Sequence, residues 1–174
     1  MQKRGFSLVE LLIALLIMAV VAAIAIALFG GILNSSKVSA DAEAQQIVKK
    51  SLTAYMSSSN DTGLSMLGGT TVTCDALIHE LTCRFTIKND SSGKKTSILY
   101  SGSSLPTGYT WPTVAVTEPS IQNGDYGPFL DINKRLFPIS DKTMNRWQIK
   151  VHSVSQVIDI QATSAAVNVE IVSD

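Results

Sequence analysis

The sequence has few of the motifs from which catalytic sites are built. Its 174 residues include no Walker-type glycine loop, no His-Glu-x-x-His metal pair and no Gly-x-Ser-x-Gly nucleophile turn. The two histidines, His79 and His152, lie far apart in the chain. Asp125, Asp131 and Asp141 share one loop region, but their spacing matches no calcium-binding loop. We therefore expect no enzyme activity, no cofactor and no metal site.

The chain also lacks an excess of positive charge. Lys and Arg together number 14, and so do Asp and Glu, which makes the formal net charge zero. Beyond the first few residues, adjacent cations occur as isolated pairs: Lys49 and Lys50, Lys94 and Lys95, and Lys134 and Arg135. A nucleic-acid-binding protein would carry clustered excess Lys and Arg. We therefore predict no specific nucleic-acid site and interpret these pairs as solvated surface.

Charge is entirely missing from one long stretch near the N-terminus. Residues 11–36 contain no charged side chain, and the basic residues Lys3 and Arg4 precede them. At about 1.5 Å per residue, roughly 25 helical residues span about 37 Å, which exceeds the ~30 Å hydrocarbon core of a bilayer. The stretch therefore predicts a membrane-spanning helix, with the basic head in the cytoplasm and the remainder outside it.

One carboxylate, Glu10, lies just inside this apolar helix. A charge in hydrocarbon costs on the order of 3 kcal/mol or more, so such a residue usually has a partner or a function. A secretory signal peptide carries no acid there and has an apolar core of only ~7–15 residues, although Ala22 and Ala23 imitate a cleavage site. A plain single-pass anchor would explain the apolar helix, but it would not explain the junction between Gly5 and Phe6.

Residues 5–10, with the sequence Gly-Phe-Ser-Leu-Val-Glu, resemble the processing and methylation site of the type IV pilins and the related pseudopilins. The resemblance implies that a prepilin peptidase cuts between Gly5 and Phe6 and that the new amine of Phe6 is methylated. It also implies that Glu10 pairs with this amine on a neighbouring subunit. Methylation keeps the positive charge, and an ammonium and a carboxylate attract strongly in an apolar core. Loss of residues 1–5 would leave a net charge of −2.

The resemblance divides the chain into four parts: a leader peptide at 1–5, a transmembrane or filament-core helix at 6–36, an amphipathic continuation of the helix at 37–58, and an extracytoplasmic globular head at 59–174. Apolar residues of the third part recur near one face of a helix: Val38, Ala42, Val48, Leu52 and Tyr55. Charged residues such as Asp41 and Glu43 fall mostly elsewhere. The polar segment 57–63 should end the helix, with Asn60 or Gly63 in a left-handed turn.

Two adjacent glycines, Gly30 and Gly31, interrupt the apolar helix. Each costs about 1 kcal/mol relative to alanine in a helix. Many type IV pilins have a proline in this part of the helix, where this chain has Ala27. Two interpretations stay open: a weak point at which the helix stretches during assembly, and close helix–helix packing at small residues.

The remainder of the chain predicts an α+β head. A short helical turn is expected at 75–81, and strands at 84–88 and 97–101 should form a hairpin around the turn 89–93. An edge strand is expected near 114–116. Alternating runs at 147–151, 157–161 and 167–171 suggest an antiparallel meander that is apolar on one face. The predicted fold class is α+β and pilin-like, with one long N-terminal helix packed by its second half on an antiparallel sheet.

The two cysteines, Cys74 and Cys83, follow the apolar helix and should lie outside the cytoplasm. An oxidising compartment favours a disulfide, which would stabilise the head by up to about 3 kcal/mol. A metal-binding pair is the alternative, with His79 as one further ligand. Many pilins have a disulfide near the C-terminus instead, so the role of that loop is not carried over.

The function implied by the resemblance is structural: the major pilin of a type IV pilus, with roles such as twitching motility, cell adhesion or DNA uptake. The implied partners are copies of the chain in a helical homopolymer, the prepilin peptidase, the pilus assembly machinery and, before assembly, the inner membrane. The mature protein would lie in the extracellular pilus, or fimbrium. Two alternatives stay open: a pseudopilin or minor pilin of a type II secretion or competence system, and a membrane-anchored extracytoplasmic enzyme or binding protein.

Overall fold

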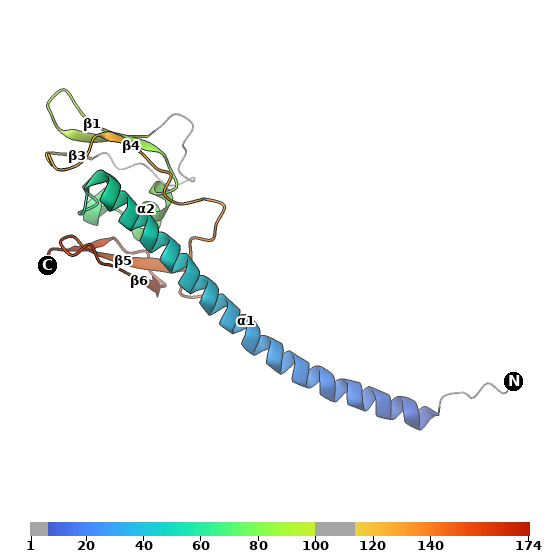
Figure 1. Ribbon diagram of the computed structural model, residues 1–174. Coiled ribbons are helices and arrows are strands. Elements are labelled where there is room, and N and C mark those ends of the chain that lie inside the picture. Colours follow the sequence, from blue (N-terminus) through green and yellow to red (C-terminus); the bar gives the residue numbers. More distant parts are fainter. Residues whose placement is uncertain (1–6, 100–113) are drawn as a thin grey trace. The chain divides into compact units, whose positions relative to one another are not determined.

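The computed structural model describes residues 7–99 and 114–174 (Figure 1). The chain divides into two compact units, residues 1–39 and residues 40–174. The first unit contains the start of helix α1 (Leu8–Ser59), and the second contains the rest of α1 together with every other helix and strand. We call residues 40–174 the head.

Helix α1 confirms the long helix that the sequence predicts. It runs through the whole charge-free stretch and continues without a break to Ser59. The next residue, Asn60, has a φ of 58°, which is the left-handed conformation predicted for the end of the helix. The carboxylate of Asp61 fixes this end, because it accepts a hydrogen bond from the Tyr55 hydroxyl at 2.6 Å and two from the backbone N–H groups of Ser65 and Met66, each at 2.8 Å.

Within the head, one face of α1 is buried. Its buried residues recur every three or four positions: Asp41, Ala44, Val48, Ser51, Leu52, Tyr55, Met56 and Ser59. The predictions for Val48, Leu52 and Tyr55 are therefore confirmed. Those for Val38 and Ala42 are wrong, since both are exposed. The polar Asp41 lies on the buried face because its carboxylate accepts hydrogen bonds from a neighbouring loop.

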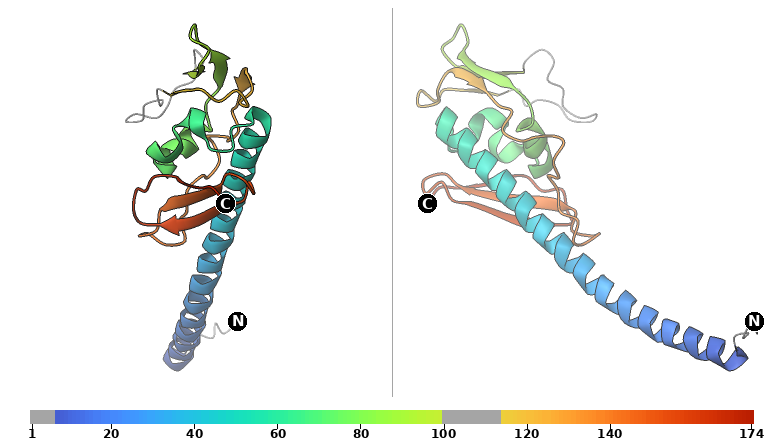
Figure 2. Two further views of the ribbon diagram at one scale, coloured as in Figure 1. Left: turned by 90° about the vertical axis from the view of Figure 1, so that its left-hand side faces the viewer. Right: turned by 45° about the vertical axis from the view of Figure 1, so that its right-hand side comes forward.

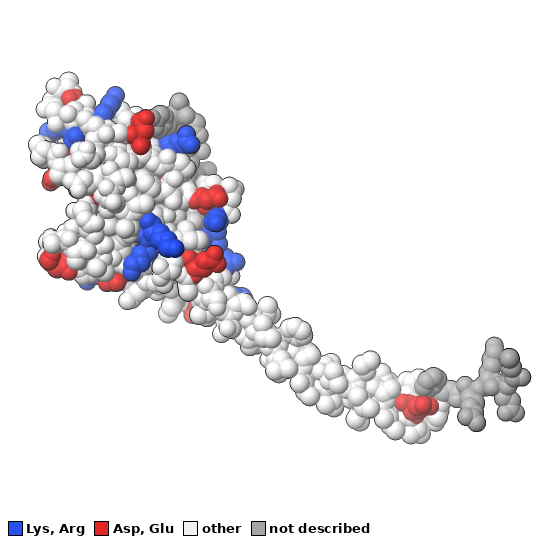
Figure 3. All heavy atoms as spheres, viewed as in Figure 1, with Lys and Arg blue, Asp and Glu red and all other residues white. Residues whose placement is uncertain are grey.

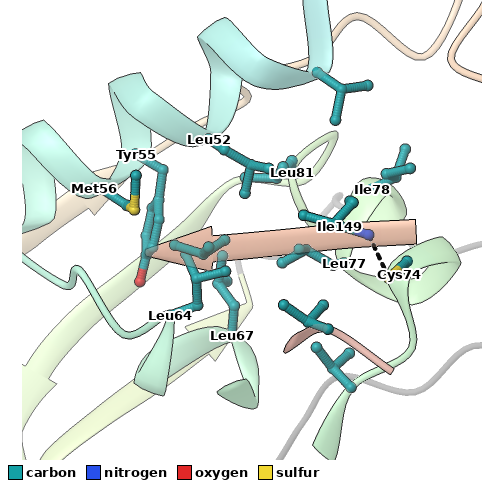
Figure 4. Packing of buried hydrophobic residues seen from close by; sticks show 14 of the residues in the cluster. Leu52, Tyr55, Met56, Leu64, Leu67, Cys74, Leu77, Ile78, Leu81 and Ile149 are labelled. Carbon is teal, nitrogen blue, oxygen red and sulfur yellow. Dashed lines mark hydrogen bonds between the residues drawn. The ribbon is translucent and has the colours of Figure 1, made fainter. Parts of the chain in front are cut away.

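The hydrophobic core joins α1 to helix α2 (Cys74–Glu80) and to two sheets. Figures 1 and 2 show α2 between these sheets. In Figure 4, Leu52, Tyr55 and Met56 of α1 point toward buried leucines of the following loops and toward Ile149. Tyr55 also lies edge-on to Phe129, with ring centroids 5.8 Å apart. The helix and the sheets thus bury each other's apolar faces, as the sequence predicts.

The first sheet has four antiparallel strands in the order β3-β2-β1-β4. Their bounds are β1 (Phe85–Asn89), β2 (Lys95–Leu99), β3 (Ala115–Val116) and β4 (Gly124–Tyr126). The predicted hairpin is confirmed, with Asn89 opposite Lys95 and with Gly93 in its turn at a φ of 82°. The predicted edge strand near 114–116 is confirmed as β3.

The second sheet has three strands in the order β6-β5-β7: β5 (Arg146–His152), β6 (Ile158–Thr163) and β7 (Glu170–Val172). Trp147, Ile149 and Val151 of β5 are buried, as their alternation predicts. The meander prediction is wrong, because β7 pairs with β5 in parallel. Residues 167–169 pair with residues 72–74 through hydrogen bonds of 2.9 and 3.0 Å. After this pairing the chain continues into β7, which lies on the side of β5 opposite β6.

Candidate assembly and processing site

The described part of the candidate site begins at Ser7, one residue before α1. The predicted cleavage and methylation positions, Gly5 and Phe6, lie outside the described residues. The carbonyl oxygen of Ser7 accepts hydrogen bonds from the backbone N–H groups of Glu10 at 3.1 Å and Leu11 at 3.2 Å. Glu10 is thus in the first turn of α1, where the helix dipole favours a negative charge.

No residue between 7 and 36 is buried in the structure. Seventeen large apolar side chains of this segment are exposed, from Leu8 to Leu33. Full burial of one such side chain is worth about 1.5–3 kcal/mol, so this surface represents tens of kcal/mol. Among the described residues, α1 is the one helix long and apolar enough to cross a membrane. Such a surface requires lipid or other apolar helices around it.

Glu10 is the one charged side chain in the segment 7–36, and it is exposed. Figure 3 shows the long apolar stretch after it without an acidic or basic group. Within the described residues, Glu10 forms no ion pair. The chain therefore presents one carboxylate at the edge of an apolar surface, with nothing from its own described residues to neutralise it.

Gly30 and Gly31 lie inside α1, and the helix continues through both. A Cβ atom at either position would meet no atom within 4 Å apart from the neighbouring backbone of the helix itself. No contact within the described chain therefore explains why these residues are glycine. The two interpretations of the pair, a weak point and a helix–helix contact, stay predictions.

The predicted disulfide is not formed: Cys74 and Cys83 are buried free thiols. Cys74 begins α2, and Cys83 lies three residues after the end of this helix. Each sulfur also has its own partner. The Ile149 N–H donates to Cys74 Sγ at 3.3 Å, and Cys83 Sγ donates to the His79 carbonyl oxygen at 3.6 Å. Burial raises the pKa of both thiols.

Four acids in the described part of the head are buried, which the sequence did not predict: Asp41, Asp61, Asp75 and Glu80. Glu80 is 1% exposed, and neither of its carboxyl oxygens has a hydrogen-bond partner in the described structure. Burial raises the pKa of Glu80 to about 8. For Asp41, burial favours a higher pKa, but hydrogen bonds from Ser140 and Ile139 and the charge of Arg135 outweigh it, so the pKa is lowered. The burial of Asp41 has no local sequence signal, because it depends on the distant residues Ile139 and Ser140.

The residues considered for metal binding lie on different elements. His79 is in α2 and its ring lies 5.5 Å from that of Phe137, whereas His152 ends β5 and contacts Asp174 at 2.6 Å. In residues 7–99 and 114–174, no group of three or more His, Cys, Asp or Glu side chains is arranged to hold a metal ion.

Comparison with known families gives one match. Residues 1–26 match the family described as "Prokaryotic N-terminal methylation motif". This motif is the prepilin signature of type IV pilins and pseudopilins, and it implies processing by prepilin peptidase and pilus assembly. Searches of curated proteins and of solved structures found no match. The motif and the α+β layout with a long apolar N-terminal helix support a pilin-like or pseudopilin protein.

Proposed function

We propose that this chain is a prepilin whose mature form is the major subunit of a type IV pilus. Prepilin peptidase cuts between Gly5 and Phe6, and the exposed amine of Phe6 is methylated. The apolar segment 6–36 holds the precursor in the inner membrane and then joins the apolar segments of other copies in the core of the filament. The head faces outward and needs no catalytic activity for this role.

The observation that carries the proposal is the surface of α1 between residues 7 and 36. It is exposed, apolar all round and free of charge apart from Glu10 at its start. A helix that is hydrophobic on every side is stable only inside a membrane or a bundle of helices. A pilin subunit occupies both environments in turn, and the prepilin signature at residues 1–26 supports this sequence of events.

The position of Glu10 supports pairing with an amine of another copy. Cleavage creates a cation at Phe6, four residues before Glu10, and an isolated charge of either sign is heavily penalised in an apolar core. An amine and a carboxylate from neighbouring subunits neutralise each other there. The pairing also sets the register between two helices, because a subunit displaced along the filament would leave both charges unpaired.

The same motif is compatible with a pseudopilin or minor pilin, which would be processed in the same way but would form short or rare assemblies. A membrane-anchored enzyme or binding protein is the candidate of another class. These functions are distinguished by the abundance and length of surface fibres and by the effect of changing Glu10.

The cleavage step is tested with Gly5→Val. We expect this variant to remain in the membrane at the higher mass of the precursor, since the peptidase site would be lost. Ser7→Ala, two residues away, is the matched control and should be cut normally. N-terminal sequencing of the wild-type protein should begin at Phe6, and normal trimming of Gly5→Val would contradict the assigned cleavage position.

The pairing step is tested with Glu10→Val, which should be cut normally yet assemble poorly, because valine is stable in lipid but cannot neutralise the amine. Glu118→Gln removes an exposed carboxylate of the head and should assemble like the wild type. Electron microscopy of sheared surface fibres gives the yield. Wild-type yield from Glu10→Val would refute the pairing, and abundant long fibres of this chain would separate a major pilin from a pseudopilin.

A further inference from the structure

The long connection between β4 and β5 has an unusual surface. Three of the six large apolar side chains that are exposed in the described part of the head lie in its residues 131–145: Ile132 at 58%, Ile139 at 40% and Met144 at 47%. Three cations of the same segment, Lys134, Arg135 and Lys142, form no ion pair within the described residues. Exposed apolar groups beside unpaired cations are typical of segments that rest on a membrane surface.

Two of these cations border a hollow against α1. Lys134 and Arg135 line it from the loop, and Ala40, Glu43, Ala44 and Ile47 line it from α1. The hollow has a volume of about 230 Å³. The cations Lys134 and Arg135 could bind the phosphate of a phospholipid, and the apolar side chains beside them could contact the start of its acyl chains.

The loop is anchored to Asp41, a residue that follows the charge-free stretch closely in the sequence. The Asp41 carboxylate accepts hydrogen bonds from the backbone N–H groups of Ile139 and Ser140, each at 2.8 Å. Asp41 is five residues after Ser36, the last residue of the charge-free stretch. Five residues span at most about 18 Å whatever their conformation. The anchor point of the loop is therefore always within that distance of the end of the membrane-spanning stretch.

We propose that residues 131–145 and the hollow beside α1 bind anionic phospholipid of the outer leaflet while the precursor waits in the membrane. Lys134, Arg135 and Lys142 contact headgroup phosphates, and Ile132 and Met144 enter the interface. The inference rests on the membrane-inserted stage of the proposed function and does not depend on polymerisation. Assembly into a filament would then have to release this surface from lipid.

Acidic groups limit the strength of this contact. Glu43 borders the same hollow, Asp131 and Asp141 belong to the loop, and the Asp41 carboxylate interacts electrostatically with Arg135. The Asp131 and Asp141 carboxylates accept hydrogen bonds within their own turns, from Asn133 and Thr143. Figure 3 shows acidic and basic groups side by side on the visible face of the head. Lipid binding should therefore be moderate and reversible, and removal of Glu43 should strengthen it.

The test uses the full chain in lipid nanodiscs and hydrogen–deuterium exchange of the peptide covering residues 131–145. In discs with about 30% phosphatidylglycerol, exchange should be at most about fivefold slower than in phosphatidylcholine discs, because Lys134, Arg135 and Lys142 exceed the acids of residues 131–145 by one charge and Glu43 opposes them. Salt at about 0.5 M should reduce the difference, because it screens exposed charges. The β1–β2 turn, residues 89–95, is the internal reference and should exchange equally in both discs.

Three variants separate the proposed contacts from general effects. Lys134→Gln/Arg135→Gln/Lys142→Gln should abolish the difference between the two lipids, whereas Glu43→Gln should enlarge it. Ile132→Ser should weaken protection in the phosphatidylglycerol discs without removing its salt dependence. Lys88→Gln/Lys94→Gln, which removes two exposed cations near the β1–β2 turn, is the matched control and should behave like the wild type.

Equal exchange of residues 131–145 in the two lipids would overturn the proposal. So would protection that appears only with two copies per disc, since a second copy would then be the occupant. Failure of the wild-type chain to insert into either disc is a different result, because it would contradict the membrane-spanning stage of the proposed function itself.

Discussion

The two stretches of α1 differ in where their apolar side chains find contacts. Residues 7–36 are apolar on every side and none of them is buried, whereas residues 40–59 are apolar on one face and bury that face in the head. The first stretch contains no charge after Glu10, and the second contains four charged residues. The first stretch of α1 therefore has a surface suited to lipid or to other apolar helices, and the second has a surface that packs within the head.

The comparison teaches that burial is not a property of a residue type. Leucine at position 16 is exposed and leucine at position 52 is fully buried, although both lie in the same helix. Only the second has partners within its own chain. The apolar surface of residues 7–36 has to find its partners outside the chain, and this need is the physical basis of the proposed assembly.

The largest expected effect comes from truncating matched leucines in the two stretches. Leu52→Ala should lower the free energy of unfolding of the head by about 2–5 kcal/mol, because it leaves a cavity in a fully packed core. Leu16→Ala should change it by less than about 0.5 kcal/mol. Denaturant unfolding of the full chain in detergent measures both. Equal losses would contradict the division of α1 into two independent surfaces.

A second prediction concerns Glu80, the buried acid whose carboxyl oxygens have no hydrogen-bond partner in the described structure. The folded-state pKa of Glu80 is about 8, above its ordinary value of 4.5, so the folded head keeps a proton that the unfolded chain releases. Its stabilising contribution is complete below about pH 4.5 and is lost as the pH rises toward 8. The wild-type head should therefore lose roughly 3 kcal/mol more than Glu80→Gln between pH 5 and pH 8.

Unfolding curves at several pH values measure this difference. Glu118→Gln, on an exposed acid of the head, should show the pH dependence of the wild type. Parallel stability profiles for the wild type and Glu80→Gln would show that the Glu80 carboxyl finds a partner or reaches water.

A third prediction concerns the glycine pair in the exposed stretch. Gly30→Ala and Gly31→Ala should each stabilise the helix locally by about 1 kcal/mol and leave the head unchanged. Ala27→Gly, one turn earlier, should have the opposite effect. Hydrogen exchange of residues 24–34 in micelles measures the local stability. A wild-type filament yield in the alanine variants would contradict the weak-point interpretation.

The smallest expected effect is that of a reducing agent on the head. With Cys74 and Cys83 as free thiols, reductant should change the free energy of unfolding by less than about 0.5 kcal/mol, whereas a disulfide would contribute up to about 3 kcal/mol. Thiol titration of the denatured chain without reductant should give two free thiols. A lower count, or a clear loss of stability on reduction, would restore the disulfide interpretation.

Sequence patterns predicted the elements of the head better than their pairing. The alternation of Trp147, Ile149 and Val151 identified a half-buried strand, and the turn residues before Lys95 identified the hairpin. The parallel placement of β7 was missed, because strand direction depends on where residues 167–169 meet residues 72–74, which are distant in sequence. The sequence was sufficient to identify Glu10 as a candidate site residue, because it is the one charged residue in the apolar segment 7–36.

The sequence by itself determined the long helix, its charge-free first stretch, the lone Glu10 and the amphipathic pattern at Val48, Leu52 and Tyr55, because these are local periodicities and compositions. The tertiary structure decided which polar groups are buried and which strands meet. Asp41 accepts hydrogen bonds from Ile139 and Ser140, and Cys74 accepts one from Ile149, through contacts between segments far apart in the chain. Such contacts follow from how whole elements fill space together, and no local pattern encodes them.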